Sequence, residues 1–367
     1  MLEKNTNNLL LKNIQNNKAS QWGFIYFQAM IISSNISLKP YNTFGIDAFA
    51  KFFTTIRSIE NFQELLQDDL YKNNEPLILG GGSNMLLTKN VNGLVIKNEL
   101  KGIEIVKETG NDIWVKCAGG EVWHELVEWC IAKNFGGLEN LSLIPGCTGA
   151  SPMQNIGAYG VEIKDTFYEL EAIHVVTGEK VTFSKRDCEF GYRESVFKHR
   201  YKNQFLITSV TFQLSKSPVF HIEYGAIKQE LETMNIKELS IQEISQAVIR
   251  IRSSKLPDPK KIGNAGSFFK NPEIPATRFH ELKAEFPNLV AFPLENGNYK
   301  LAAGWLIEQC GLKGYRKGDA GVHKLQALVL VNYGQASGQD VYDLSSHVLK
   351  TVKDKFGVEL EREVNIL

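Results

Sequence analysis

Apolar residues recur along the chain with two different periods, which predicts a mixture of strands and helices. Residues 50–56 (AKFFTTI) predict a strand, and residues 58–73 have helical spacing behind Ser58, a residue type that commonly caps helices. Residues 76–87 predict an apolar strand that runs into three glycines. Because these glycines form GGGSN and not GxGxxG, a Rossmann dinucleotide site is not indicated.

The rest of the chain predicts strands in the middle and a second unit at the end. One helix is expected over residues 121–134, and another over 241–256 that stops at Pro257. The last third predicts two helices and two strands, in LAAGWLIEQC, SGQDVYDLSSHVLKTVKDKFG, ALVLVN and VELEREVNIL. The whole pattern predicts an α+β protein with a C-terminal α/β unit.

Composition narrows the class of protein. Of 367 residues, 43% are hydrophobic and 22% are charged, which is typical of a globular protein. Lys and Arg together number 41, as do Asp and Glu, so no broad basic surface is expected for nucleic acid. The five scattered cysteines lack a CxxC pair, which favours reduced thiols in the cytoplasm over disulfides or a metal site. No apolar run has the length of a membrane span.

The N-terminal segment differs from the rest. Residues 1–20 are polar and rich in Asn, and the short apolar run that follows contains Gln28. A signal peptide is conceivable, but the weak charge and Gln28 disfavour it. We therefore expect residues 1–37 to be a disordered or misassigned leader, with Met30 as an alternative start.

Two glycine-rich segments are candidates for ligand binding. Gly80, Gly81 and Gly82 allow a close backbone approach and a nest of N–H groups for an anion, although on the glycines alone an ordinary tight turn between strands is the simpler explanation. Residues 137–162 form a long loop of small residues, which is typical of a functional loop. Its candidates are Gly146, Gly149, Ser151, Gln154, Asn155, Gly157 and Gly160. Cys147 in the same loop is more readily explained as a buried inert thiol.

Arg193 and Ser267 stand among aromatic residues. Arg193 lies in FGYRES, where a guanidinium suits a carboxylate or a developing enolate, and a surface ion pair with Glu194 is the alternative. Ser267 lies in GNAGSFFKNP, where it is either a loop serine bonded to its own backbone or a group that does chemistry.

The C-terminal ELEREV holds three alternating glutamates. If it is a strand, Glu359, Glu361 and Glu363 share one face. That face is either a solvated edge or a cluster in which one carboxyl pKa is raised.

In order and spacing, these segments resemble the UDP-N-acetylenolpyruvoylglucosamine reductase family. The matching motifs are LKPYNTFGID, LILGGGSN, GLENLSLIPGCTGASPMQNIGAYGVE, FGYRESVFKH, KLPDPK, GNAGSFFKNP and LAAGWLIEQCGLKG. They cover about nine tenths of the chain, and HIEYGAIK resembles the tyrosine loop of the longer, type I branch. The resemblance implies FAD-binding subdomains of the vanillyl-alcohol-oxidase type over 38–98 and 99–250, and a substrate-binding domain over 251–367.

The resemblance also implies the reaction and its cofactors. NADPH would reduce FAD, and the flavin would reduce UDP-N-acetylglucosamine enolpyruvate to UDP-N-acetylmuramate for peptidoglycan synthesis. The protein is expected to act as a monomer. FAD contacts are implied for Gly80, Gly81, Gly82, Ser83, Asn84, Pro145, Gly146, Ser151, Gln154, Asn155 and Gly157.

The resemblance assigns roles around the substrate. Ser267 would donate the proton, and Arg193 and Glu363 would stabilise the carboxylate-enolate. Substrate contacts are implied for Tyr224, Lys255, Asn271 and Gln326. The chain departs from the family pattern at Asn365, where long-branch relatives typically carry arginine.

Two alternatives remain on the sequence alone. One is another FAD oxidase or dehydrogenase of the same fold, for which Cys147 would be the candidate flavin tether. The other is a nucleotide-sugar-binding protein without catalysis, which Asn365 alone supports.

Overall fold

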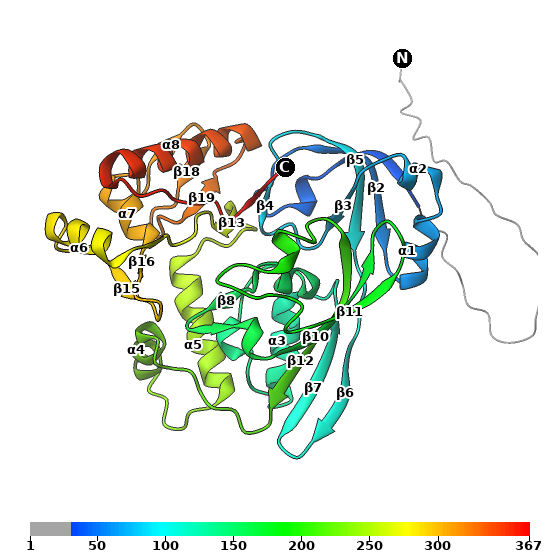
Figure 1. Cartoon of the computed structure of the whole chain (residues 1–367), viewed down its shortest axis with the longest axis horizontal. Coiled ribbons are helices and arrows are strands. Elements are labelled where there is room, and N and C mark those ends of the chain that lie inside the picture. Colours follow the sequence, from blue (N-terminus) through cyan, green and yellow to red (C-terminus); the bar gives the residue numbers. More distant parts are fainter. Residues whose placement is uncertain (1–30) are drawn as a thin grey trace, which may run out of the picture.

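The structure is a computed structural model that describes residues 31–367 (Figure 1). Most of the predicted leader, including Met30, lies outside the described residues. Its last part needs a correction, because β1 (Ser33–Ser37) pairs antiparallel with β2 (Phe49–Ile56). This polar segment becomes a strand because it covers an open sheet edge, a tertiary effect that local composition does not reveal.

The first sheet is built around β5 (Val91–Asn98). Its strand order is β1-β2-β5-β3, and β2 and β3 (Pro76–Leu79) both run parallel to β5. The side chains of Leu94, Val95 and Ile96 are fully buried, as expected for a central parallel strand covered on both faces.

The predicted helix over 58–73 is interrupted. Ser58 caps α1 (Ile59–Leu65), and its side chain accepts a hydrogen bond from Asn61 N at 3.1 Å. A new helix, α2 (Asp69–Lys72), then begins because the Asp68 carboxylate accepts from Leu70 N at 2.7 Å. A capping aspartate in the middle of the segment thus divides the predicted helix into two shorter helices.

The second sheet is antiparallel and has five strands. Its order is β11 (Lys180–Ser184), β10 (Phe167–His174), β12 (Phe205–Ser215), β7 (Asp112–Ala118) and β6 (Ile103–Thr109). Helix α3 (Trp123–Ala132) packs its apolar side on this sheet, and Trp123 meets Phe212 edge to face with centroids 5.7 Å apart. Helices α4 (Gly225–Thr233) and α5 (Ile241–Lys255) form a smaller apolar cluster beside it.

The C-terminal part carries two small antiparallel sheets. One has the order β13 (Gly263–Ser267), β19 (Val329–Asn332), β18 (Ala320–Val322) and β17 (Arg316–Lys317). The other has the order β14 (Glu273–Ile274), β16 (Tyr299–Leu301) and β15 (Ala291–Pro293). Three helices pack with them: α6 (Ala276–Glu285), α7 (Ala303–Gln309) and α8 (Gly338–Phe356). No helix within residues 31–367 has both the length and the hydropathy to cross a bilayer.

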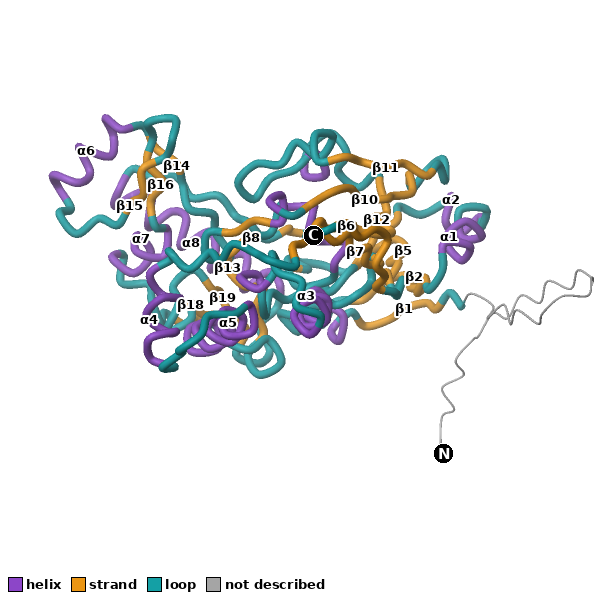
Figure 2. The backbone as a smooth tube through the Cα atoms, turned by 90° about the horizontal axis from the view of Figure 1, so that it is seen from below, coloured by secondary structure: helices purple, strands orange, loops and turns teal. Residues whose placement is uncertain are grey.

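The last residues lie in the middle of the molecule, against the first subdomain (Figures 1 and 2). The predicted final strand is wrong for most of its length, since only β20 (Asn365–Ile366) forms, parallel to β4 (Met85–Leu86). The preceding glutamates take separate partners: Glu359 pairs with Lys353, Glu361 with Lys270 and Glu363 with Arg193. The segment crosses from one domain to another, so it does not remain in one sheet.

Candidate active site

The glycine-rich turn that follows β3 touches the glycine-rich loop around Gly146. A β-carbon added to Gly81 would lie 2.7 Å from Gly146 Cα, and one added to Gly82 would lie 2.0 Å from the carbonyl oxygen of Tyr41. Gly82 also has a φ of 62°. Across the contact, the Ser83 hydroxyl donates to the Pro145 carbonyl at 3.2 Å. Only glycine fits at both positions, because backbone meets backbone.

The GGGSN turn has unused hydrogen-bond donors. Among residues 31–367, the backbone N–H groups of Gly81, Gly82 and Ser83 donate to no protein acceptor. Gly82 is buried and its neighbours are half-buried. Buried backbone donors are normally paired, so a run of free ones in a glycine turn fits an anion such as the diphosphate of FAD.

The second glycine-rich loop is held by its own polar side chains. The Ser151 hydroxyl donates to Thr148 O at 2.7 Å, and both residues are buried. The Asn155 amide donates to Gly191 O at 2.9 Å and to Glu162 at 3.0 Å. These two side chains therefore fix the shape of the loop, and a role in FAD binding remains a prediction for them.

Arg193 is anchored in an unusual backbone conformation. Its φ of 55° is rare for a residue with a side chain, and such strain concentrates at functional sites. The guanidinium donates to Gly157 O and lies 3.7 Å from Glu162 and 3.5 Å from Glu363. The ion pair with Glu194 that the sequence left open is not formed in residues 31–367, since Glu194 pairs with Lys270, Lys198 and His199.

Glu363 is a buried carboxyl beside this arginine. Its side chain is 12% exposed, and Gln154 Nε2 lies at a marginal 3.5 Å from its Oε1. Burial raises the pKa of Glu363, although the charges of Arg193, Lys198 and Lys270 oppose the shift. Such a carboxyl holds a proton more readily than an exposed one.

Ser267 lies on the strand next to Glu363. The pairing of β13 with β19 is irregular between Asn264 and Ser267, and Gly266 has a φ of 69°. Such an irregularity turns the following side chain away from the regular direction. One residue further on, Phe268 O accepts a hydrogen bond from Glu363 N at 2.8 Å. The structure thus brings the Ser267 strand to the Glu363 segment and Glu363 to Arg193.

The predicted substrate residues lie in two places. Tyr224 and Lys255 belong to the α4–α5 pair, where Tyr224 is 51% exposed and meets Tyr159 edge to face at 5.5 Å. Asn271 and Gln326 belong to the C-terminal part. The Asn271 side-chain oxygen accepts from Ala303 N at 3.0 Å, which supports the start of α7.

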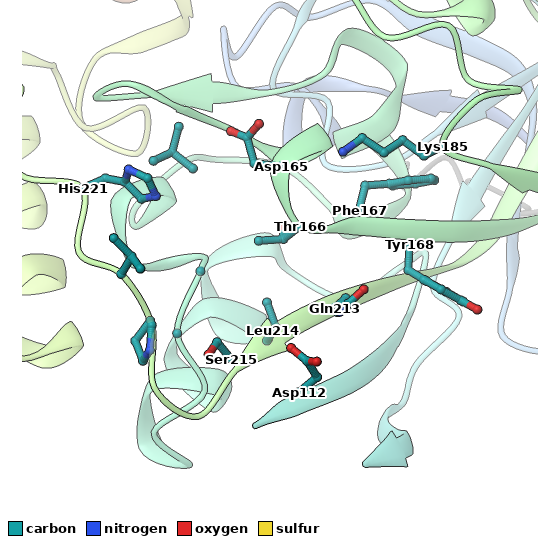
Figure 3. Close-up of a pocket in the computed structure, with 15 residues that line it drawn as sticks. Asp112, Asp165, Thr166, Phe167, Tyr168, Lys185, Gln213, Leu214, Ser215 and His221 are labelled. Carbon is teal, nitrogen blue, oxygen red and sulfur yellow. The ribbon is translucent and has the colours of Figure 1, made fainter. Parts of the chain in front are cut away.

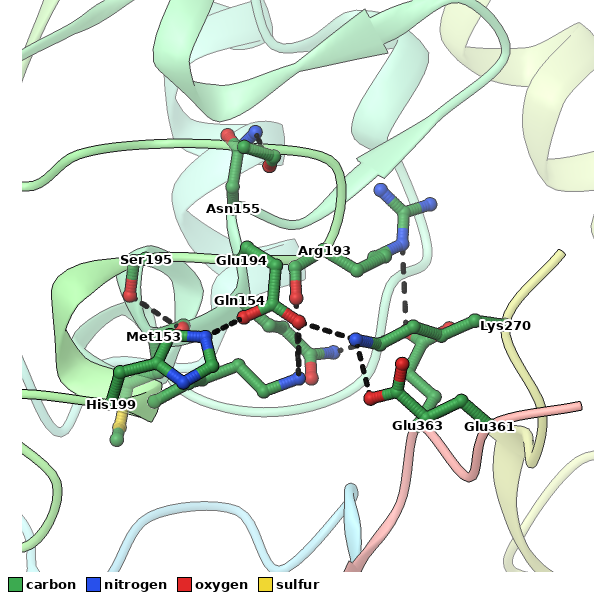
Figure 4. A network of polar contacts seen from close by, with 12 residues as sticks. Met153, Gln154, Asn155, Arg193, Glu194, Ser195, His199, Lys270, Glu361 and Glu363 are labelled. Atoms are coloured by element: carbon green, nitrogen blue, oxygen red, sulfur yellow. Dashed lines mark hydrogen bonds and ion pairs between the residues drawn. The ribbon is translucent and has the colours of Figure 1, made fainter. Parts of the chain in front are cut away.

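Two features of the site were missed by the sequence prediction. Arg252, in the last turn of α5, is half-buried with an Nε that has no hydrogen-bond partner in residues 31–367. Lys270 lies in an ion-pair network with Glu194 and Glu361 (Figure 4). The sequence feature that could have indicated Lys270 is a lysine that directly follows two phenylalanines, both of which are buried in the structure.

A separate hollow of about 530 Å³ lies at the far end of the second sheet. Asp112, Asp165, Thr166, Lys185 and His221 are among its lining residues (Figure 3). None of the predicted site residues lines it. It is therefore distinct from the site built around Arg193, Glu363 and Ser267.

Fold and site together define a flavin-binding α+β protein. Residues 50–184 match the family described as FAD binding domain, and residues 258–367 match UDP-N-acetylenolpyruvoylglucosamine reductase, C-terminal domain. These matches confirm the predicted α+β fold class with an FAD-binding unit followed by a C-terminal domain.

Whole-chain relatives give the particular family. The UDP-N-acetylenolpyruvoylglucosamine reductase of Flavobacterium johnsoniae is 53% identical over 92% of this chain and 100% of its own. That of Pseudomonas savastanoi pv. phaseolicola is 50% identical over 91% and 98%. The crystal structure of the Thermus caldophilus reductase superposes with a TM-score of 0.65 at 24% identity, over 92% of this chain and 99% of that chain. The chain belongs to the UDP-N-acetylenolpyruvoylglucosamine reductase family.

Proposed function

We propose that this chain reduces UDP-N-acetylglucosamine enolpyruvate to UDP-N-acetylmuramate with NADPH as reductant, and that Arg193, Glu363 and Ser267 carry the step on the sugar substrate. The observation that supports these roles most directly is the half-buried Arg193–Glu363 pair beside the strand that bears Ser267. An enolpyruvyl group has a carboxylate next to its reacting double bond. An arginine beside a carboxyl whose pKa is raised by burial suits that carboxylate.

The GGGSN turn and the 144–161 loop would hold FAD through their backbones. The contact between Gly81 and Gly146 leaves no room for side chains, and the free N–H groups suit the diphosphate. Among side chains, Ser83, Asn84 and Gln154 line this junction. When bound, FAD supplies the substrate's methylene carbon with a hydride that comes from NADPH.

The chain's own residues then manage charge and protons. Adding a hydride to the methylene carbon places negative charge on the neighbouring carbon and its carboxylate. Arg193 would bind that carboxylate, and Glu363 in its neutral form would donate a hydrogen bond to it. Ser267 would deliver the proton to the neighbouring carbon, so that one hydride and one proton are added across the double bond.

The remaining predicted residues would hold the nucleotide. We assign Tyr224, Lys255, Asn271 and Gln326 to the UDP-sugar, with the Lys255 ammonium suited to a phosphate. One chain carries the whole proposed set, so a monomer is sufficient. The five free cysteines accord with a cytoplasmic site of action. Burial raises the pKa of the Cys147 thiol, which disfavours a thiolate tether to the flavin and hence an oxidase with covalent FAD.

The test separates the two half-reactions. In anaerobic stopped-flow, the Ser267→Ala variant should accept electrons from NADPH at the wild-type rate. Its reoxidation by UDP-N-acetylglucosamine enolpyruvate should slow about 10²- to 10⁴-fold, the usual effect of losing a general acid.

Ser217→Ala, an exposed serine in a loop near the far hollow, serves as the control and should behave as wild type. Reoxidation of Ser267→Ala at the wild-type rate would remove Ser267 from the mechanism. A wild-type protein that the substrate fails to reoxidise would overturn the proposed function itself.

A further inference from the structure

Lys270 is a nearly buried cation between two carboxylates. Its side chain is 9% exposed, and its ammonium contacts Glu194 and, at 2.8 Å, Glu361 (Figure 4). Burial alone would lower the pKa of Lys270, but the hydrogen bonds and charges of Glu194 and Glu361 outweigh it and raise the pKa. The lysine is therefore a fixed positive charge, not a proton donor.

Each partner of Lys270 sits beside a residue of the site. Glu194 directly follows Arg193, Glu361 stands two residues before Glu363, and Lys270 itself stands three residues after Ser267. Backbone pairing strengthens this junction, because Lys270 N donates to Glu361 O at 2.9 Å and Glu363 N donates to Phe268 O at 2.8 Å. One ammonium thus joins three segments that are remote in sequence.

The surroundings of this ammonium are strongly charged. Lys198 Nζ lies 3.6 Å from Glu194 and donates to Arg193 O at 3.2 Å, and His199 Nε2 lies 2.6 Å from the other oxygen of Glu194. Taking a lysine out of water is costly unless its partners are fixed around it. Removing its charge alone would free Glu361 and leave Glu194 to Lys198 and His199. The Arg193 loop would then lose one of its ties to the Glu363 segment and would depend on the weaker, 3.5 Å ion pair between Arg193 and Glu363.

We propose that Lys270 is a positioning residue for the reduction of the enolpyruvyl group, which holds the Arg193 loop and the Glu363 segment in register with Ser267. The inference rests on the proposed function. It assigns no contact between Lys270 and the substrate. It predicts that the geometry of the second half-reaction depends on Lys270 and that electron uptake from NADPH does not.

The decisive variant is Lys270→Met, which keeps an unbranched side chain of nearly the same length and removes the charge. In anaerobic stopped-flow, flavin reduction by NADPH should stay within about twofold of wild type. Reoxidation by saturating substrate should slow about 10- to 100-fold, because a misplacement near 1 Å costs that much. Lys270→Arg, which can keep both ion pairs, should recover part of the loss.

Two further variants protect the test against misfolding. Glu361→Gln changes a side chain that is 70% exposed, so we expect it to fold, and it should slow reoxidation in the same direction by a smaller factor. Glu359→Gln is the matched control on the same segment, since within residues 31–367 its carboxylate pairs only with the exposed Lys353, and it should leave both rates unchanged. Lys313→Met, which breaks a different ion pair, that of Lys313 with Glu308, controls for the loss of a lysine.

The outcomes are distinct from those for the proposed function. If wild type is reoxidised by the substrate but Lys270→Met and Glu361→Gln match it, the inference is overturned. Equal slowing of both half-reactions would also overturn it, because that result indicates general structural damage. If Lys270→Met binds no FAD, the reoxidation rates of Glu361→Gln and Glu359→Gln decide: slower reoxidation of Glu361→Gln alone supports the inference, and equal rates overturn it.

Discussion

Glu363 lies where burial and charge act on one carboxyl in opposite directions. Burial raises its pKa, and Arg193, Lys198 and Lys270 oppose the shift without cancelling it. An acid whose pKa is raised on folding contributes stability that is complete below its unfolded-state pKa. That contribution is lost as the pH rises through the folded-state pKa. Near neutral pH the buried Glu363 therefore lowers the stability of the folded protein, but its neutral form can donate a hydrogen bond.

The variant Glu363→Gln tests this balance. A neutral amide cannot ionise, so the Tm difference between variant and wild type should become more positive from about pH 4 to about pH 8. Reoxidation of the reduced enzyme by substrate should slow about 10²-fold, because the hydrogen bond to the developing charge is weakened. Thermal unfolding across that pH range and stopped-flow at one pH measure the two effects.

For the control variant, the Tm difference should change with pH in the opposite direction. A hydrogen bond from Lys353 lowers the pKa of the exposed Glu359, so Glu359→Gln should give a small Tm difference that becomes more negative as the pH rises. A Tm difference for Glu363→Gln that stays constant with pH would mean that its carboxyl is not perturbed by folding.

Residues of the site were predictable to different degrees. Arg193, Ser267 and Glu363 were predicted through a resemblance that spans most of the chain, while their residue types alone left simpler structural explanations open. Lys270 was missed because its carboxylate partners are remote in sequence, Glu194 being 76 residues away. Ion pairs of that separation exist only once the fold brings the segments together.

At the scale of elements, the two glycine-rich turns act as one unit. The sequence predicted each turn, because runs of glycine are a local signal, but not their contact. The prediction of the final strand failed for the same reason. The local alternating pattern does not reveal that the segment's partner is β4, which is distant in sequence. Asn365 illustrates the result, since its side chain donates to Asn84 O at 2.9 Å and so ties the C-terminal segment to the GGGSN turn.

Adding a methyl group to Gly81 tests the unit directly. In Gly81→Ala the new β-carbon would lie 2.7 Å from Gly146 Cα, so one backbone segment must move. Overpacking of this kind costs about 1–3 kcal/mol, and we expect FAD to bind about 10- to 100-fold more weakly. The ratio of flavin to protein absorbance after dialysis, and titration of the apoprotein with FAD, measure the loss.

Gly80→Ala is the neighbouring control for this experiment. Its β-carbon would lie 3.7 Å from Cys147 Cβ, which is ordinary contact, and Gly80 is not among the glycines with positive φ. FAD affinity should be nearly unchanged. Equal weakening by both substitutions would show that the turn tolerates no methyl group anywhere and that the Gly81–Gly146 contact is not special.

At the scale of the molecule, the core does not follow the predicted domains. One hydrophobic cluster contains buried residues of the first subdomain, such as Phe44 and Val95, together with Phe268 and Leu330 of the C-terminal part. Phe44 and Phe268 meet edge to face at 6.1 Å. Gly263 is required at this joint, because a β-carbon there would lie 2.2 Å from Phe44 O. Periodicity identifies which residues are buried but not which of them share a core.

Phe268→Ala should therefore destabilise two parts of the molecule at once. Removing a fully buried phenylalanine costs about 3–5 kcal/mol. Because the cluster is shared, hydrogen exchange should quicken both in β2 and β5 of the first sheet and in β19 of the C-terminal sheet. Phe212→Ala is a matched change, since Phe212 is also fully buried but belongs to the cluster of the second sheet. It should quicken exchange in β7, β10 and β12 first. If Phe268→Ala loosened β19 and left β2 and β5 protected, the two parts would be independent folding units that merely touch, and the position of Ser267 against Glu363 would depend on the C-terminal segment alone.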